Sequence, residues 1–121
     1  MRPEVRFHIR EKSQRPALGI GPGKIALLEA IAETGSITSA AKKLNISYRR
    51  AWLLVDETNR CLVEPAVETL TGGQKGGGTA LTRSGAELVR RYRVLERQTE
   101  AAVSSKLGAI LRKSAIRRAH D

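Results

Sequence analysis

The hydrophobic residues between positions 21 and 34 recur at the spacing of an amphipathic helix. Gly21-Pro22-Gly23 predicts the start of this helix, because a proline at the first helical position has no N–H to leave unsatisfied. Thr34-Gly35 predicts its end, and Lys24 is expected outside the apolar stripe. The stripe itself consists of Ile25, Leu28, Ile31 and Ala32.

Two shorter helices joined by a tight turn are predicted next, between residues 35 and 59. Thr38 and Ser47 are the expected N-caps, since a hydroxyl oxygen can accept a hydrogen bond from a free backbone N–H. Asn45 suits the left-handed residue that ends the first of these helices. The small side chains of Ala40 and Ala41 let the two helices approach closely. The inward positions are Ile37, Ala40, Ala41, Leu44, Ile46, Ala51, Val55 and Thr58.

This arrangement is a helix-turn-helix, whose second helix enters the major groove of DNA with its N-terminal residues against the base edges. The charge pattern agrees, because no acidic residue occurs between Glu33 and Asp56, and a face that approaches phosphate has reason to exclude carboxylates. The alternative is a plain pair of helices with a solvated basic face. The basic residues of this stretch are Lys42, Lys43, Arg49 and Arg50.

A β-hairpin is predicted after Pro65, which cannot continue a helix. Residues 67–70 and 79–81 have strand character, and the tip between them is rich in glycine. A hairpin at this place is the wing of a winged helix-turn-helix. Gly76 and Gly77 allow the backbone to lie close to DNA with their N–H groups towards phosphates, and Lys75 adds a charge. An ordinary disordered loop is the alternative.

The N-terminal residues alternate between apolar and polar at positions 5–10, which is the period of a half-buried strand. Residues 11–16 are polar and end in Pro16, which indicates a turn, and residues 17–20 can return as a second strand. We therefore expect an N-terminal β-hairpin over residues 1–20 that packs against the helical body.

A single long helix is predicted to open at Thr82-Arg83-Ser84-Gly85 and to continue into a basic tail, over residues 83–121. Its apolar positions are spaced alternately four and three apart, the signal of a helix that pairs along its axis. We expect a homodimer, with packing inside the chain as the alternative. The fold class is then mainly α with a small β component, with the winged helix-turn-helix in residues 21–82. The predicted dimer interface consists of Leu88, Tyr92, Leu95, Thr99, Ala102 and Val103.

The 121 residues carry a net charge of +10. This charge predicts a polyanion as partner, with nucleic acid as the first candidate and an anionic membrane surface as the second. Cys61 is the single cysteine, which fits a reducing cytoplasm. No apolar run approaches the ~20 residues of a membrane span, so no spanning segment is expected, and of the two polyanions we expect nucleic acid and no membrane as the partner. The sequence has no nucleophile–base pair and no metal-ligand spacing, and Gly19–Lys24 lacks the spacing of a phosphate loop. We therefore expect no enzyme and no metal site.

The helix-turn-helix and wing together resemble the N-terminal domain of ModE, a family of bacterial molybdate-responsive transcription regulators. The matching residues run from Gly35 to Trp52 and from Thr71 to Gly85, and the first part alone also resembles LysR-type regulators. Ser47-Tyr48 with Ala51-Trp52, followed by a glycine-rich wing that ends in Leu-Thr-Arg, is more specific to ModE. The resemblance implies a winged helix-turn-helix dimer on an inverted-repeat operator.

Molybdate is bound in that family by C-terminal Mop-type β-barrel domains, and this sequence ends at Asp121 without one. We therefore expect no cofactor and no directly bound molybdate, with a separate oxyanion-sensing protein as a candidate partner. The leading hypothesis is a sequence-specific cytoplasmic transcription regulator that binds double-stranded DNA as a homodimer. The alternatives are an architectural protein that coats DNA without sequence preference and a small-anion sensor that acts through the glycine-rich segment.

The residues expected to bind DNA come from the helix-turn-helix, the wing and the start of the last helix. Arg49 or Arg50 is expected to read guanine through a bidentate contact. Trp52 either reaches DNA or packs as a core or interface aromatic. The full predicted set is Thr38, Ser39, Lys42, Lys43, Ser47, Tyr48, Arg49, Arg50, Trp52, Lys75, Gly76, Gly77 and Arg83.

Overall fold

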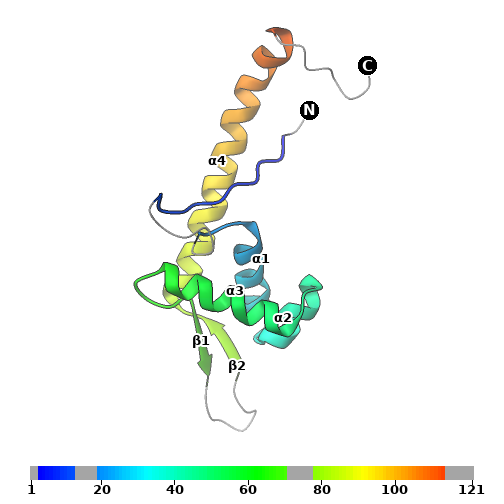
Figure 1. The fold of residues 1–121 in the computed structure, drawn as a ribbon. Helices are drawn as coiled ribbons and strands as arrows, with labels where there is room; N and C mark the ends of the chain where they lie inside the picture. The colour runs from blue at the N-terminus through cyan, green and yellow to red at the C-terminus, as the bar shows by residue number, and fades with distance from the viewer. Residues whose placement is uncertain (1–2, 13–18, 71–77, 114–121) are drawn as a thin grey trace.

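The computed structural model describes residues 3–12, 19–70 and 78–113 of the chain. Three helices come first: α1 (Pro22–Thr34), α2 (Ile37–Leu44) and α3 (Tyr48–Cys61). The antiparallel strands β1 (Val67–Leu70) and β2 (Gly78–Leu81) follow, and the long helix α4 (Arg83–Lys113) comes last (Figure 1). This order confirms the predicted fold class, a mainly α winged helix-turn-helix with a small β component.

Helix α1 forms the centre of the core, because α2, α3, α4 and strand β2 all pack against it. A helix with neighbours on so many sides has little solvent-facing surface, and α1 accordingly buries more residues than its predicted stripe. Ala32 is an exception: it was expected to face inward and is exposed. The buried apolar residues of α1 are Ile25, Leu27, Leu28, Ala30 and Ile31.

Lys24 is also buried, with only 8% of its surface exposed, so the prediction that it lies outside the stripe was wrong. Its ammonium donates to the carbonyl oxygen of Gly19 (2.6 Å) and lies 3.8 Å from a carboxylate oxygen of Glu57. Because a lysine can bury its stem while its head keeps polar partners, the charge did not force the residue outward. Its spacing four residues before Leu28 and seven before Ile31 was the signal for the inner face.

The ends of α2 and α3 have the predicted chemistry except at the start of α2. Ser36, not Thr38, caps α2: its hydroxyl oxygen accepts from the backbone N–H three residues later (3.1 Å). Ser36 has the extended backbone of an N-cap, whereas Thr38 already lies inside the helix. Asn45 ends α2 in the left-handed conformation (φ 57°), as predicted. Ser47 caps α3 by accepting the N–H three residues later (3.0 Å), also as predicted.

The predicted wing strands are present, and their pairing begins with Val67 opposite Leu81. The hairpin is joined to the end of α1, since the N–H of Thr79 donates to the carbonyl oxygen of Gly35 (3.0 Å). This bond fixes the direction in which the hairpin leaves the helical body. The predicted tip residues lie in 71–77, outside the described residues.

Asn59 connects α3 to the start of β1. Its side-chain oxygen accepts the backbone N–H groups of Ala66 (2.8 Å) and Val67 (3.2 Å). The N–H of Thr82 donates to the carbonyl oxygen of Ala66 (2.9 Å), which joins the beginning of α4 to the same point. Helix α3, the β1–β2 hairpin and α4 are therefore held together around Ala66.

The N-terminal segment, defined here as residues 3–12, lies along α4 instead of forming the predicted hairpin strands (Figure 1). Within the described residues only one isolated antiparallel bridge, between Ile9 and Ile20, joins it to the next part of the chain. The ring of Phe7 stacks on Tyr92 of α4 with centroids 4.9 Å apart, and the Tyr92 hydroxyl donates to the carbonyl oxygen of Phe7 (2.7 Å). The N-terminal segment therefore packs against helix α4 and not against a second strand.

Helix α4 packs against α1 near its start and then projects away from the helical body (Figure 1). Arg93 joins the two helices: it pairs with Glu29 of α1 and with Glu96 of its own helix. The hydrogen bonds that its guanidinium donates to these two carboxylates raise the pKa of Arg93 above its usual range. None of the helices in the described part of the chain is long and apolar enough to cross a bilayer.

Candidate nucleic-acid interface

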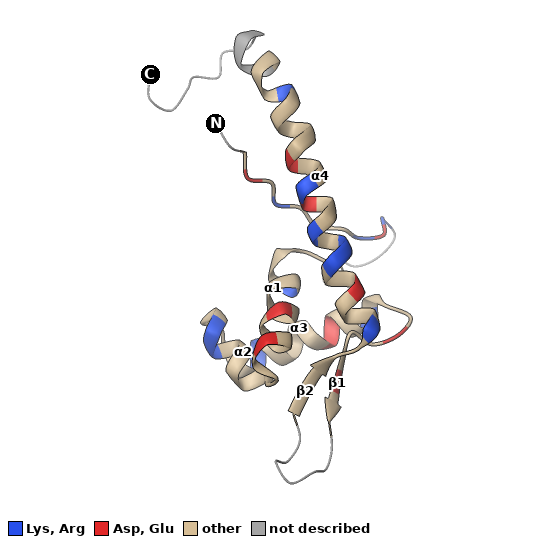
Figure 2. Cartoon of the chain, turned by 180° about the vertical axis from the view of Figure 1, so that it is seen from behind, with Lys and Arg blue, Asp and Glu red and all other residues tan. Residues whose placement is uncertain are grey.

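The predicted contact residues of the helix-turn-helix lie on the surface at the junction of α2 and α3. All of them are exposed, and Figure 2 shows lysine and arginine on α2 and along α4. The last turn of α2 is basic, and no acidic residue lies in the first turn of α3. The exposed residues of the junction are Thr38, Ser39, Lys42, Lys43, Ser47, Tyr48, Arg49, Arg50 and Trp52.

The structure distinguishes the two arginines of α3, either of which was expected to read guanine and of which Arg50 was the one predicted to lose specificity on substitution by alanine. Arg49 stands two residues before the buried Ala51, so at about 100° per residue it projects from the opposite, outer side of the helix. Arg50 stands four residues before Leu54 and seven before Glu57, on the flank that faces α1. Arg49 is therefore the better placed of the two to reach a base edge.

The aromatic residues of α3 lie on the surface. Trp52 has 41% of its surface exposed and Tyr48 has 54%, and their rings meet edge to face with centroids 6.2 Å apart. Trp52 is therefore not a core aromatic of this chain. Leu53, which the sequence analysis did not single out, is 47% exposed beside them and adds apolar surface to the same helix.

Lys43 is exposed but carries a partner, because its ammonium pairs with the carboxylate of Glu33 at the end of α1. A pair this exposed contributes little stability, so phosphate can compete for the lysine at small cost. Arg83 is exposed at the first residue of α4, next to the base of the hairpin. The remaining predicted DNA contacts, Lys75, Gly76 and Gly77, lie outside the described residues.

The predicted dimer seam of α4 is only partly available. Tyr92 corrects the prediction: it is 1% exposed, and the N-terminal segment of the same chain covers it. Leu88 is half-buried and packs against the core of its own chain. Beyond the body, Leu95 is 43% exposed and Ala102 is also exposed, whereas Thr99 and Val103 are half-buried.

Two residues that hold the interface in place were not singled out from the sequence as contacts: Lys24 and Asn59. Within the described residues, no three His, Cys, Asp or Glu side chains are grouped so that they could hold a metal ion. Burial raises the pKa of the Cys61 thiol, which disfavours the nucleophilic thiolate, and its sulfur donates to the carbonyl oxygen of Glu57 (3.2 Å).

Comparisons with known proteins agree with this geometry. No protein-family model matches the sequence. The chain is 43% identical over 86 residues to the transcriptional regulator ModE of Haemophilus influenzae, across 71% of this chain and 34% of that protein. It is 45% identical over 74 residues to the DNA-binding transcriptional dual regulator ModE of Escherichia coli K12, across 61% of this chain and 28% of that protein.

A solved structure titled Multiple Antibiotic Resistance Repressor, MarR, superposes with a TM-score of 0.56 at 18% identity, over 75% of this chain and 66% of that one, which shows the fold alone. The chain spans about a third of the length of the curated relatives it matches. About two thirds of its residues are thus homologous to transcriptional regulators named ModE, on a winged-helix fold shared with MarR.

Proposed function

We propose that this chain binds DNA as part of a transcription regulator of ModE type, that it recognises a specific sequence, and that it acts as a homodimer. The observation that carries the proposal is the first turn of α3. It is exposed, free of acidic residues and flanked by the basic end of α2, on a winged-helix scaffold. The homology to ModE regulators supports the same function.

The described residues take three roles in this proposal. Arg49 projects from the outer side of α3 and reads a base edge, since a guanidinium matches the two acceptors of guanine. Lys42 and Arg83 are exposed on α2 and at the start of α4, and contact phosphates, which gives affinity without sequence information. Tyr48 and Trp52 supply apolar surface between these charges.

The experiment that tests the function is a selection of genomic fragments on the purified chain near physiological salt, with and without molybdate. Enrichment of an inverted repeat supports a sequence-specific dimer. Even coverage of the genome favours the architectural alternative and contradicts the proposal. We expect molybdate to leave the selection on this chain unchanged.

Arg49→Ala should reduce sequence discrimination. A bidentate arginine–guanine contact is worth ~1–3 kcal/mol of discrimination, so the ratio of the Kd values for a random and a selected duplex should fall by about 5- to 150-fold. Fluorescence anisotropy with two duplexes of equal length measures this ratio. Lys42→Ala is the control: it should weaken both duplexes alike and lower the slope of log Kd against log salt by about 1. Equal weakening of both duplexes by Arg49→Ala would contradict its role as a base reader.

Leu95→Lys should convert the chain from dimer to monomer. Leu95 is 43% exposed on the part of α4 that projects from the body, so a charge there would be buried between two helices in the dimer. Sedimentation velocity over a range of concentrations measures the change. Leu70→Lys is the matched control, because Leu70 is 48% exposed on β1 at the other end of the molecule. If the unmodified chain sediments as a monomer, the homodimer is wrong.

A further inference from the structure

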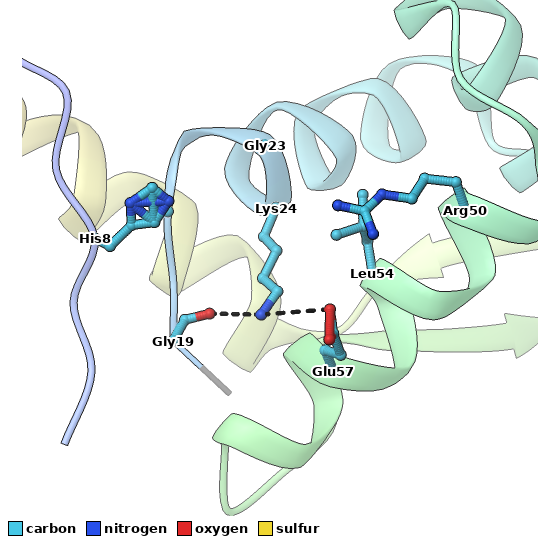
Figure 3. Close-up of a pocket in the computed structure, with 8 residues that line it drawn as sticks. His8, Gly19, Gly23, Lys24, Arg50, Leu54 and Glu57 are labelled. Carbon is cyan, nitrogen blue, oxygen red and sulfur yellow. Dashed lines mark hydrogen bonds and ion pairs between the residues drawn. The ribbon is translucent and has the colours of Figure 1, made fainter. Parts of the chain in front are cut away.

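A pocket of about 420 Å³ lies behind the recognition helix, away from the outer side that carries Arg49. Three parts of the chain form its walls: the N-terminal segment, the stretch that leads into α1, and the flank of α3 (Figure 3). This volume is within the range of pockets that bind small molecules. The lining residues used below are His8, Gly21, Lys24, Arg50, Leu54 and Glu57.

Among the described residues, no carboxylate pairs with the guanidinium of Arg50. Glu57 is the carboxylate of the lining, and its charge faces the buried ammonium of Lys24 at 3.8 Å. The guanidinium of Arg50 points from α3 into the pocket, towards the start of α1 (Figure 3). It makes no hydrogen bond or ion pair with any residue that the structure describes. A guanidinium in this position is a binding group for a carboxylate or a phosphate.

The opposite side of the pocket adds two further kinds of donor. The imidazole of His8 lines it and can offer an N–H. Helix α1 begins there with Gly21 as its N-cap, and within the described residues no side chain caps its first N–H groups. The positive end of a helix favours an anion at this place, in addition to the two side chains. Donors from three separate parts of the chain therefore face the same space.

The wall that carries His8 is built into the fold. Its neighbour Ile9 exchanges two backbone hydrogen bonds with Ile20, both 2.7 Å long, and Phe7 on the other side stacks on Tyr92. Gly21 lets the imidazole lie against the backbone, because a Cβ at this position would come within 2.6 Å of Nε2 of His8. The imidazole is thus anchored from both neighbours.

We propose that this pocket binds a small phosphate monoester and that the bound phosphate, whose negative charge lies against α3, competes with DNA for the positive charge of this helix. A phosphate group has three terminal oxygens that accept strong hydrogen bonds, one each for Arg50, His8 and the start of α1. The body of the ligand occupies the space beside Leu54. The competition rests on the proposed function, because it needs α3 to bind DNA; the binding of the ligand does not.

Ligand binding is tested first, without DNA, on the full chain. The probe is glycerol 3-phosphate, and sodium chloride of equal ionic strength is the reference. We expect a saturable rise in Tm of about 5 °C at a probe concentration of about ten times Kd. Arg50→Gln and His8→Ala should each lose most of this rise. Arg49→Gln, which removes the same charge from the outer side of the same helix, should keep it.

Two results would overturn the binding site: no rise in Tm beyond that in chloride, or an equal loss of the rise in Arg49→Gln and Arg50→Gln.

The second test measures Kd for a selected duplex in the presence of the probe and in chloride of equal ionic strength. The probe should weaken DNA binding of the unmodified chain several-fold and leave that of Arg50→Gln nearly unchanged. An unchanged Kd for the unmodified chain overturns the competition, whereas a chain that binds the probe but no DNA overturns the proposed function alone.

Discussion

Tyr92→Ala should lower the free energy of unfolding by about 3–5 kcal/mol, because it removes a fully buried aromatic ring that the surrounding residues cannot replace. Tyr92 is 1% exposed, and its ring stacks on Phe7 at a centroid distance of 4.9 Å. The loss should also release the N-terminal segment from α4, since Phe7 keeps no other aromatic partner among the described residues. Urea unfolding followed by circular dichroism measures the change.

Tyr92→Phe separates the hydroxyl from the ring and should cost only about 1 kcal/mol, the usual value of one hydrogen bond. The lost bond is the one from the Tyr92 hydroxyl to the carbonyl oxygen of Phe7 (2.7 Å). A loss as large for phenylalanine as for alanine would show that the ring itself contributes little. The opposite result, no loss for either variant, would contradict the attachment of the N-terminal segment to α4.

The difference in stability between the unmodified chain and Tyr92→Phe should depend on pH. Burial, and to a smaller degree the nearby Glu96 carboxylate, raise the pKa of Tyr92 above its ordinary value. The folded chain therefore holds the phenol proton more tightly than the unfolded chain. The stability that this group contributes is fully present below about pH 10 and is lost as the pH rises beyond it. The advantage of the unmodified chain over Tyr92→Phe should narrow above about pH 10.

Gly85→Ala should destabilise the fold by about 3 kcal/mol, although alanine is the better helix former. A Cβ on Gly85 would lie 2.9 Å from the carbonyl carbon of Ala66 and closer still to its oxygen. That oxygen accepts the N–H of Thr82 (2.9 Å), so neither backbone can move without breaking the junction of α4 with the hairpin. Because the wing starts at this junction, DNA affinity should fall with stability.

Gly23→Ala is the matched control, because it makes the same substitution in the first turn of a helix. A Cβ on Gly23 would meet nothing within 4 Å. The variant should therefore stabilise the chain by about 0.4–1 kcal/mol, since alanine restricts the unfolded state. Thermal unfolding of both variants should thus move Tm in opposite directions. A shift of the same sign in both would mean that the contact with Ala66 does not decide the effect.

Local patterns in the sequence were sufficient for the helix-turn-helix and for the two wing strands. The apolar spacing of residues 37–58 and the turn chemistry of Asn45 and Ser47 act between residues a few positions apart, so they can be recognised without a structure. Ser36 and Thr38 show the limit of this reasoning. Both are hydroxyl residues near the start of α2, and only the backbone conformation identifies the cap.

The candidate nucleic-acid interface also combines features that residue order predicts with features that only the packing of the helices decides. The acid-free, basic stretch from Lys42 to Arg50 could be recognised from residue order, because charge pattern and helical period belong to one continuous segment. The difference between Arg49 and Arg50 depends on what packs beside α3. The start of α1 lies next to Arg50 and turns its flank into a pocket.

Residue order alone located the helices, the turn, the wing strands and the basic surface of α2 and α3, since each follows from interactions between near neighbours in the chain. Only the assembled fold revealed the burial of Lys24, the hydrogen bonds between Asn59 and the start of β1, and the contact by which Phe7 covers Tyr92. Phe7 and Tyr92 are 85 residues apart, and the 4-3 spacing of α4 is the same whether its partner is another chain or the N-terminal segment. The seam of a helix specifies an apolar partner, and the geometry of the whole chain specifies which partner it is.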